Sequence, residues 1–204
     1  MSKVRAAEPL PLDGQLELVR PPAPGGLELV RRFLNTYDVQ RSIEELTTPD
    51  VLAAWLREQS LIGRKSAFKA TATDLERLWS VRENLRALAR RNNGIEDECA
   101  LEELQAASAL SAYTLTFDPG TGAARLQATA PGVDGVIGTI LAAVHAAMAD
   151  RSWPRLKACA DDTCAFAYYD HSKNGCSRWC SPETCGNRDK VKRYRERKAR
   201  TAAP

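Results

Sequence analysis

The chain has 204 residues, of which 44% are hydrophobic and 27% charged, and its formal net charge at pH 7 is +3. This length allows one large domain or a medium-sized domain with a small one, and the apolar fraction is sufficient for a packed core. No stretch suggests a signal peptide or a membrane-spanning helix, so we expect a cytoplasmic protein with no membrane partner.

Charge is unevenly distributed along the chain. Residues 151–204 contain 13 Lys and Arg against 6 Asp and Glu, a charge of +7, whereas residues 1–150 contain 16 against 20, a charge of −4. A mildly acidic body with a basic appendage predicts two regions with separate roles. The appendage should be attracted to a polyanion.

The first two thirds of the chain is predicted to be mainly helical. Residues 1–25 are rich in Pro and Gly and should form an irregular lead-in. Apolar residues then recur at helical spacing, which predicts helices near residues 26–39, 49–59, 73–94 and 95–110.

Capping residues mark where two of these helices should begin. Thr47 or Thr48 before Pro49 is typical of an N-cap followed by proline in the first turn. Thr73 with Glu76 is expected to form a capping box at the start of the third helix.

The periodicity changes after the fourth helix. Residues 112–117 and 124–130 alternate apolar and polar side chains around an Asp-Pro-Gly-Thr-Gly turn, which predicts a β-hairpin. Residues 133–150 are rich in alanine and aliphatic side chains and should form a buried helix that leads into the basic region.

Five of the six cysteines lie between residues 159 and 185. Four form two pairs, each with a gap of four residues, and two short loops with two thiolates each can satisfy a tetrahedral zinc ion. A thioredoxin-like redox site would need a gap of two residues, and a reducing compartment disfavours disulfides. We therefore predict one structural Zn²⁺ per chain, bound by Cys159, Cys164, Cys180 and Cys185. Cys176 could compete as a ligand, but using it would break the symmetry of the pairs.

The basic tail after the last cysteine has helix-forming composition. Val191 and Tyr194 fall on one narrow stripe, which could pack on the cysteine module. Basic residues line both flanks of the stripe, an arrangement suited to nucleic acid, although a solvated terminal helix and an acidic protein partner are alternatives. The candidate DNA-binding residues are Arg188, Lys190, Lys192, Arg193, Arg195 and Arg197.

The sequence thus predicts a mainly α fold with a small β-hairpin (α+β). A lead-in over residues 1–25 precedes a helical domain over 26–150. A small four-cysteine zinc module over 151–204 follows and ends in a basic helix.

The C-terminal segment closely resembles the CGNR zinc finger. It contains an Arg-Leu before the first cysteine, two four-residue-gap cysteine pairs, Arg-Trp-Cys, and the run Cys185-Gly186-Asn187-Arg188. The body resembles the ABATE domain that usually precedes this finger, through Phe33, Asn35 and Thr36. The resemblance spans roughly residues 26–200. It implies a zinc-dependent bacterial transcription regulator of the stress response, whose helical domain senses or dimerises and whose finger binds double-stranded DNA.

Other functions have less support in the sequence. A phosphate loop, a nucleophile elbow and an open metal position are all lacking, so we do not expect an enzyme. A protein-interaction adaptor, with the zinc module as scaffold, is the alternative to a regulator. Asn187, Arg188 and Arg195 are the candidates for reading bases, although Arg188 could instead brace the zinc loop.

The body carries a few polar residues on otherwise apolar helices, namely Asn35, Thr36 and Arg82. They are either buried structural hydrogen-bonding groups or contacts to a small-molecule effector. A homodimer is a further possible assembly.

Overall fold

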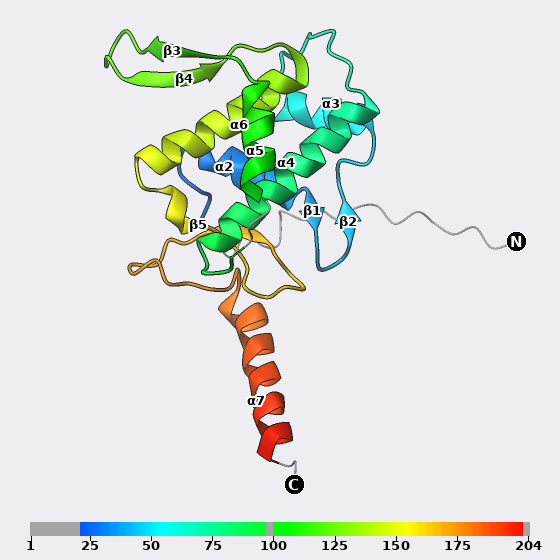
Figure 1. Ribbon diagram of the computed structural model, residues 1–204, viewed down its shortest axis with the longest axis vertical. Helices are drawn as coiled ribbons and strands as arrows, with labels where there is room; N and C mark the ends of the chain where they lie inside the picture. Colours follow the sequence, from blue (N-terminus) through cyan, green and yellow to red (C-terminus); the bar gives the residue numbers. More distant parts are fainter. Residues whose placement is uncertain (1–20, 97–99, 202–204) are drawn as a thin grey trace, which may run out of the picture.

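The computed structural model describes residues 21–96 and 100–201, and it is mainly helical as predicted (Figure 1). The helices of these residues are α2 (Leu27–Asn35), α3 (Pro49–Glu58), α4 (Ala72–Arg91), α5 (Ala100–Ala109), α6 (Gly132–Ala149) and α7 (Asn187–Thr201).

Three antiparallel hairpins accompany the helices within the described residues, and the sequence predicted one of them. They pair β1 (Tyr37–Asp38) with β2 (Ile43–Glu44), β3 (Tyr113–Phe117) with β4 (Ala124–Ala128), and β5 (Leu156–Ala158) with β6 (Ala167–Tyr169). The second of these in chain order, the β3–β4 hairpin, is the expected one and is called the central hairpin below. β6 lies between the cysteine pairs, and its partner β5 precedes the first cysteine. β1 and β2 have two residues each, too few to show an alternating pattern.

The first helix ends earlier than predicted. α2 stops at Asn35 instead of continuing towards residue 39, and Thr36 begins the turn into β1. The Thr36 hydroxyl donates to the carbonyl of Phe33 at 2.8 Å and so satisfies a carbonyl at the end of the helix.

Helix capping agrees with the prediction for α3 and differs for α4. Thr48 accepts from the backbone N–H of Val51 at 3.3 Å. The predicted box at Thr73 is wrong, because Thr71 caps α4 instead: Asp74 N–H donates to Thr71 Oγ1 at 3.1 Å, and Thr71 N–H donates to Asp74 Oδ2 at 2.9 Å. The shorter carboxylate of Asp serves the same purpose as Glu in this motif.

The larger of two hydrophobic clusters in the described residues joins the body to the β5–β6 hairpin, and the smaller one holds the four buried cysteines and Tyr168. α2, α4 and α6 pack on one another, and α2 also packs on β6 and α4 on β5. Module residues Trp153, Leu156, Ala158, Ala167 and Tyr169 lie in the same cluster of buried side chains as Phe33, Leu78 and Ile140. The boundary at residue 150 therefore separates two sequence regions that share a core.

α6 is long and apolar enough to cross a membrane by length and composition, contrary to the expectation that no segment would be. Core helices of globular proteins meet the same criterion, and the side chains of Val136, Ile137, Ile140 and Val144 lie in the core. Gly138 lies where α6 meets the central hairpin, since a Cβ there would be only 2.8 Å from Ala128 Cβ.

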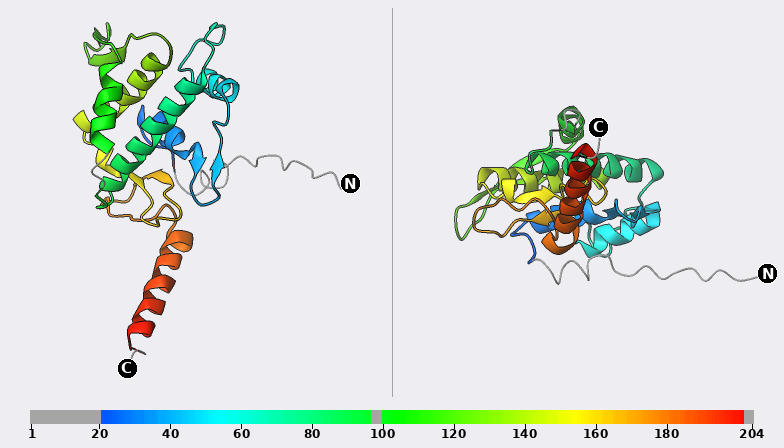
Figure 2. Two further views of the ribbon diagram at one scale, coloured as in Figure 1. Left: turned by 45° about the vertical axis from the view of Figure 1, so that its right-hand side comes forward. Right: turned by 90° about the horizontal axis from the view of Figure 1, so that it is seen from below.

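α7 extends away from the rest of the molecule (Figures 1 and 2). Its first turn packs on the turn Pro182–Gly186, and none of its residues is buried. Val191 and Tyr194 are 48% and 60% exposed, so the expectation that they pack on the module is wrong.

Candidate functional site: a four-cysteine centre and a basic helix

The first cysteine pair is held by the β5–β6 hairpin. Cys159 directly follows β5, and its backbone N–H donates to the carbonyl of Phe166 at 2.9 Å, which extends the strand pairing beyond the hairpin proper. Alternate residues of both strands are buried in the shared core. The core therefore fixes the loop that carries Cys159 and Cys164.

The second cysteine pair is held by a capped turn. Cys180 precedes Ser181, whose hydroxyl accepts from the backbone N–H of Thr184 at 3.1 Å. This cap starts the helical turn Pro182–Gly186, which contains Cys185 and runs directly into α7. The last candidate ligand is thus rigidly connected to the basic helix.

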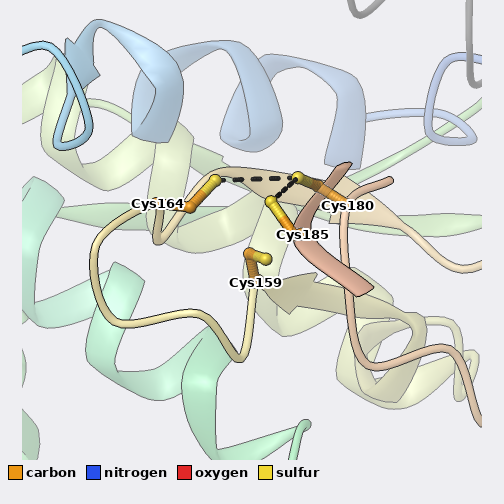
Figure 3. Close-up of side chains that lie close together, drawn as sticks. All are labelled: Cys159, Cys164, Cys180 and Cys185. Carbon is orange, nitrogen blue, oxygen red and sulfur yellow. Dashed lines mark hydrogen bonds between the residues drawn. The ribbon is translucent and has the colours of Figure 1, made fainter. Parts of the chain in front are cut away.

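The four sulfur atoms of Cys159, Cys164, Cys180 and Cys185 lie within 4.8 Å of one another, and all four residues are buried (Figure 3). Cys180 Sγ is 3.6 Å from both Cys164 Sγ and Cys185 Sγ. A tetrahedral metal with sulfur at about 2.3 Å needs neighbouring sulfurs about 3.8 Å apart. The donor set therefore fits a four-coordinate metal-binding centre.

The other two cysteines differ from these four. Cys176 is exposed and lies outside the cluster. Cys99 lies outside the described residues.

The four thiols influence one another's ionisation. Hydrogen bonds from Cys164 and Cys180 lower the pKa of Cys159 to about 2, whereas the hydrogen bond with Cys159 raises the pKa of Cys164 to about 12. The pKa of Cys180 is also raised, first by its contact with Cys159. Without a positive charge, one thiolate suppresses ionisation of its neighbours. A divalent cation would allow all four to ionise together.

Arg188 lies against the metal centre. Its Nη2 donates to Cys185 Sγ at 2.9 Å and to Gln40 Oε1 at 3.1 Å, and its Nε is 3.2 Å from Asp161 Oδ2. The bond to Cys185 raises the pKa of the guanidinium. A charged donor on a ligand sulfur offsets part of the negative charge of a thiolate centre and orients the ligand. This position corresponds to the bracing role considered for Arg188.

A buried ion pair supports the loop between the cysteine pairs, and sequence reasoning missed it. Lys157 Nζ donates to Asp170 Oδ2 at 2.9 Å and to the carbonyls of Gly175 and Ser177 at 2.6 and 3.1 Å. The two side chains are 5% and 0% exposed. The sequence did contain a signal for this pair, because each of two β-prone, otherwise apolar segments carries a charged residue.

Polar side chains of the body bind the backbone of the module. Asn35 makes two hydrogen bonds to Ala167, donating to its carbonyl at 2.9 Å and accepting from its N–H at 2.8 Å. Arg86 donates to the carbonyl of Ala165, and Asn92 and Asn93 at the end of α4 donate to module carbonyls. The body thus holds the β5–β6 hairpin in place.

The side chains of Thr36 and Arg82 contact each other, whereas the side chain of Asn35 contacts Ala167 of the module. Arg82 donates to Thr36 Oγ1 at 3.0 Å and to both carboxylate oxygens of Glu44 at 2.8 and 2.6 Å, and its guanidinium carbon lies 5.3 Å from the centroid of the Tyr37 ring. Arg82 is 3% exposed. All of these contacts are made to other groups of the protein.

The remaining predicted DNA-binding residues all project from α7. Lys190, Lys192, Arg193, Arg195 and Arg197 are exposed along the helix. Arg193 Nε pairs with Asp189 Oδ2 at 2.9 Å, and because the two side chains are 58% and 26% exposed, the pair contributes little to stability. Asn187 differs, since its side chain donates to the carbonyl of Glu183 at 2.7 Å.

Comparison with known families agrees with this architecture. Residues 27–153 match the ABATE family, described as "Putative stress-induced transcription regulator", and residues 155–198 match the CGNR zinc finger. No curated protein matches the chain. The ABATE match covers more than half of the chain, so the protein belongs to the ABATE family and carries a C-terminal CGNR zinc finger.

Proposed function

We propose, from this chain's membership of the ABATE family and from the form of α7, that it is a cytoplasmic bacterial transcription regulator that binds double-stranded DNA. One observation carries the proposal: α7 has eight basic residues against two acidic ones, and none of the fifteen is buried. A cationic helix that extends from a rigid base is suited to a phosphate backbone.

The proposed role of the cysteine centre is to hold a structural Zn²⁺. Four thiolates at tetrahedral spacing form the donor set of closed zinc sites, which leave no coordination position for a substrate. We accordingly propose a binding protein and not an enzyme. When bound, zinc would supply folding energy to the module and fix the base of α7.

The phosphate contacts are proposed to come from the exposed cations of α7. Lys190, Arg193 and Arg197 lie along one flank of the helix, and Lys192 and Arg195 along the other. Arg188 is proposed to act differently, by holding Cys185 and Asp161 and so fixing the angle at which α7 leaves the module.

An adaptor that binds another protein is the second candidate. It is favoured by exposed apolar side chains: Val191 and Tyr194 on α7, and Leu115, Phe117 and Leu126 on the central hairpin. Leu115 and Leu126 are cross-strand partners, so they lie on one face of that hairpin. If two copies associate, we propose this face as the contact. Asn35, Thr36 and Arg82 already bond within the protein, which gives no support to an effector at these residues.

The dependence of DNA affinity on salt tests the proposal. Changing Lys190, Lys192 and Arg193 together to Gln should reduce the slope of log affinity against log salt by about 3, because each lost phosphate contact contributes about 1. Binding to all duplexes should weaken while zinc content stays the same.

The matched control changes Arg64, Lys65 and Lys69 to Gln, three exposed residues of the loop between α3 and α4. This loop lies at the end of the molecule away from α7 (Figure 1). The control removes the same charge and should leave the slope unchanged. If the zinc-loaded wild type binds no duplex at low salt, DNA binding fails and the adaptor takes its place.

A further inference from the structure

The surface of α7 divides into strips of different chemistry. At about 100° per residue, Val191 and Tyr194 lie within about 60° of each other, and Asp189 and Glu196 lie on the opposite side of the helix. Six of the eight basic residues fall in two rows between these strips, Lys190, Arg193 and Arg197 on one side and Arg188, Lys192 and Arg195 on the other. Lys198 lies on the apolar stripe, one turn after Tyr194, and Arg200 lies next to Asp189 on the opposite side.

Neither Val191 nor Tyr194 is buried against another element in the described part of the chain. Both side chains are about half exposed, and the helix extends clear of the core (Figure 2). An aromatic and a branched aliphatic side chain on a strongly cationic, solvated helix are costly to leave in water, and exposed apolar groups of this kind mark contact surfaces.

Two residues at the start of α7 are already engaged inside the module. Asn187 donates to Glu183 and Arg188 donates to Cys185, so neither is available to bases while these contacts last. Any reading of base edges by this helix must come from residues further along it.

We propose that α7 binds in the major groove of double-stranded DNA, with the Val191–Tyr194 stripe facing the base edges and the two basic rows facing the phosphates of opposite strands. The inference rests on the proposed function and specifies how the DNA is bound. Phosphate contacts position the protein, and the stripe provides sequence preference.

The dimensions and charges agree with this placement. An α-helix with its side chains is about 10–12 Å across, and the major groove of B-DNA is about 12 Å wide. A helix of fifteen residues is about 22 Å long, so both basic rows can follow the groove walls over two or more turns of the α-helix. With the stripe inward, Asp189 and Glu196 face away from the DNA and avoid repulsion from the phosphates.

Each stripe residue offers a particular contact to bases. The methyl groups of Val191 can contact the C5-methyl group of thymine, which is displayed only in the major groove. The Tyr194 ring gives apolar contact, and its hydroxyl can donate to base acceptors or accept from base amino groups.

The experiment begins by selecting preferred duplexes with the full, zinc-loaded chain. Methylation of guanine N7, in the major groove, should interfere with binding to the selected site, whereas methylation of adenine N3, in the minor groove, should not. Val191→Ala with Tyr194→Ala should lower the ratio of selected-site to random-site affinity by about tenfold and leave the salt slope unchanged. Replacing contacted thymines by uracil should lower the DNA affinity of the wild type more than it lowers the DNA affinity of the Val191→Ala variant.

Glu196→Ala, on the opposite strip, is the matched control. It should change the affinity for selected and random duplexes by the same factor and so leave their ratio unchanged. Zinc content and helical circular dichroism verify that the variants remain folded. Wild-type DNA binding with an unaltered preference in the stripe variants, or interference from adenine N3 alone, overturns this inference and leaves the proposed function standing. Absence of any duplex binding by the wild type overturns both. Capture of a protein partner by the same stripe would then indicate the adaptor.

Discussion

Replacing Asn35 by alanine should destabilise the cysteine module, although residue 35 is 132 positions from the backbone it binds. The side chain makes two hydrogen bonds to Ala167, one to its carbonyl and one from its N–H, and Asn35 is 7% exposed. Ala167 belongs to β6, between Cys164 and Cys180. The substitution leaves both backbone groups buried without these partners.

The magnitude follows from those two groups. A buried polar group left without its partner costs about 1–3 kcal/mol, so the loss of both partners should lower the unfolding free energy by about 2–6 kcal/mol. For a chain of this size, each kcal/mol lowers the melting temperature by about 2–4 °C, which gives a decrease of about 4–24 °C. Because metal binding and folding of the module are linked, zinc affinity should fall by about tenfold or more.

The assay combines thermal unfolding of the zinc-loaded chain with transfer of zinc to a colorimetric chelator. Asn174→Ala, an exposed residue in the loop between the cysteine pairs, is the control and should change both readouts little. A variant Asn35→Ala with wild-type melting temperature and wild-type zinc transfer would show that the body does not support the module through these bonds.

Three further predictions concern single residues of the module and the core. Cys185→Ser should lower zinc content and unfold the module, whereas Cys176→Ser should keep one zinc per chain by plasma emission spectroscopy; metal loss from the latter would contradict the ligand set. The pKa of Asp170 is lowered from 3.8 to about 2, mainly by hydrogen bonds from Ser172 and Lys157 that outweigh the effect of burial. Its charge therefore stabilises the fold above pH 4, and this contribution is lost as the pH falls towards 2. The difference in urea-unfolding free energy between wild type and Asp170→Asn should shrink over that interval, and a pH-independent difference would contradict the assignment. Gly138→Ala should lower unfolding free energy by about 1–3 kcal/mol through overpacking, whereas Gly186→Ala should be tolerated, since its Cβ would meet Trp179 at 3.6 Å. Equal melting curves for the two glycine variants would be the contrary result.

Much of the architecture follows from local sequence patterns. Apolar spacing predicted the helical body and the central hairpin, and proline with threonine predicted the start of α3 at Pro49. These features depend on neighbours within a few residues, so their signal is present in the sequence itself. The paired cysteine spacing likewise predicted the cluster, because the thiol ligands of a tetrahedral centre come from two short loops.

Other features depend on contacts between distant residues, and only the tertiary structure decides them. The sequence left open whether Asn35 is a buried structural hydrogen-bonding group or an effector contact, and the fold shows that its side chain binds Ala167. Lys157 and Asp170 form a buried pair, and Arg188 reaches Cys185 and Gln40 instead of extending into solvent. Hydrogen bonds and ion pairs of this kind join segments brought together by the shared core, which periodicity within one segment cannot reveal. For the same reason, the sequence identified the stripe of Val191 and Tyr194, and the tertiary structure left it exposed, because α7 leaves the core at its first turn.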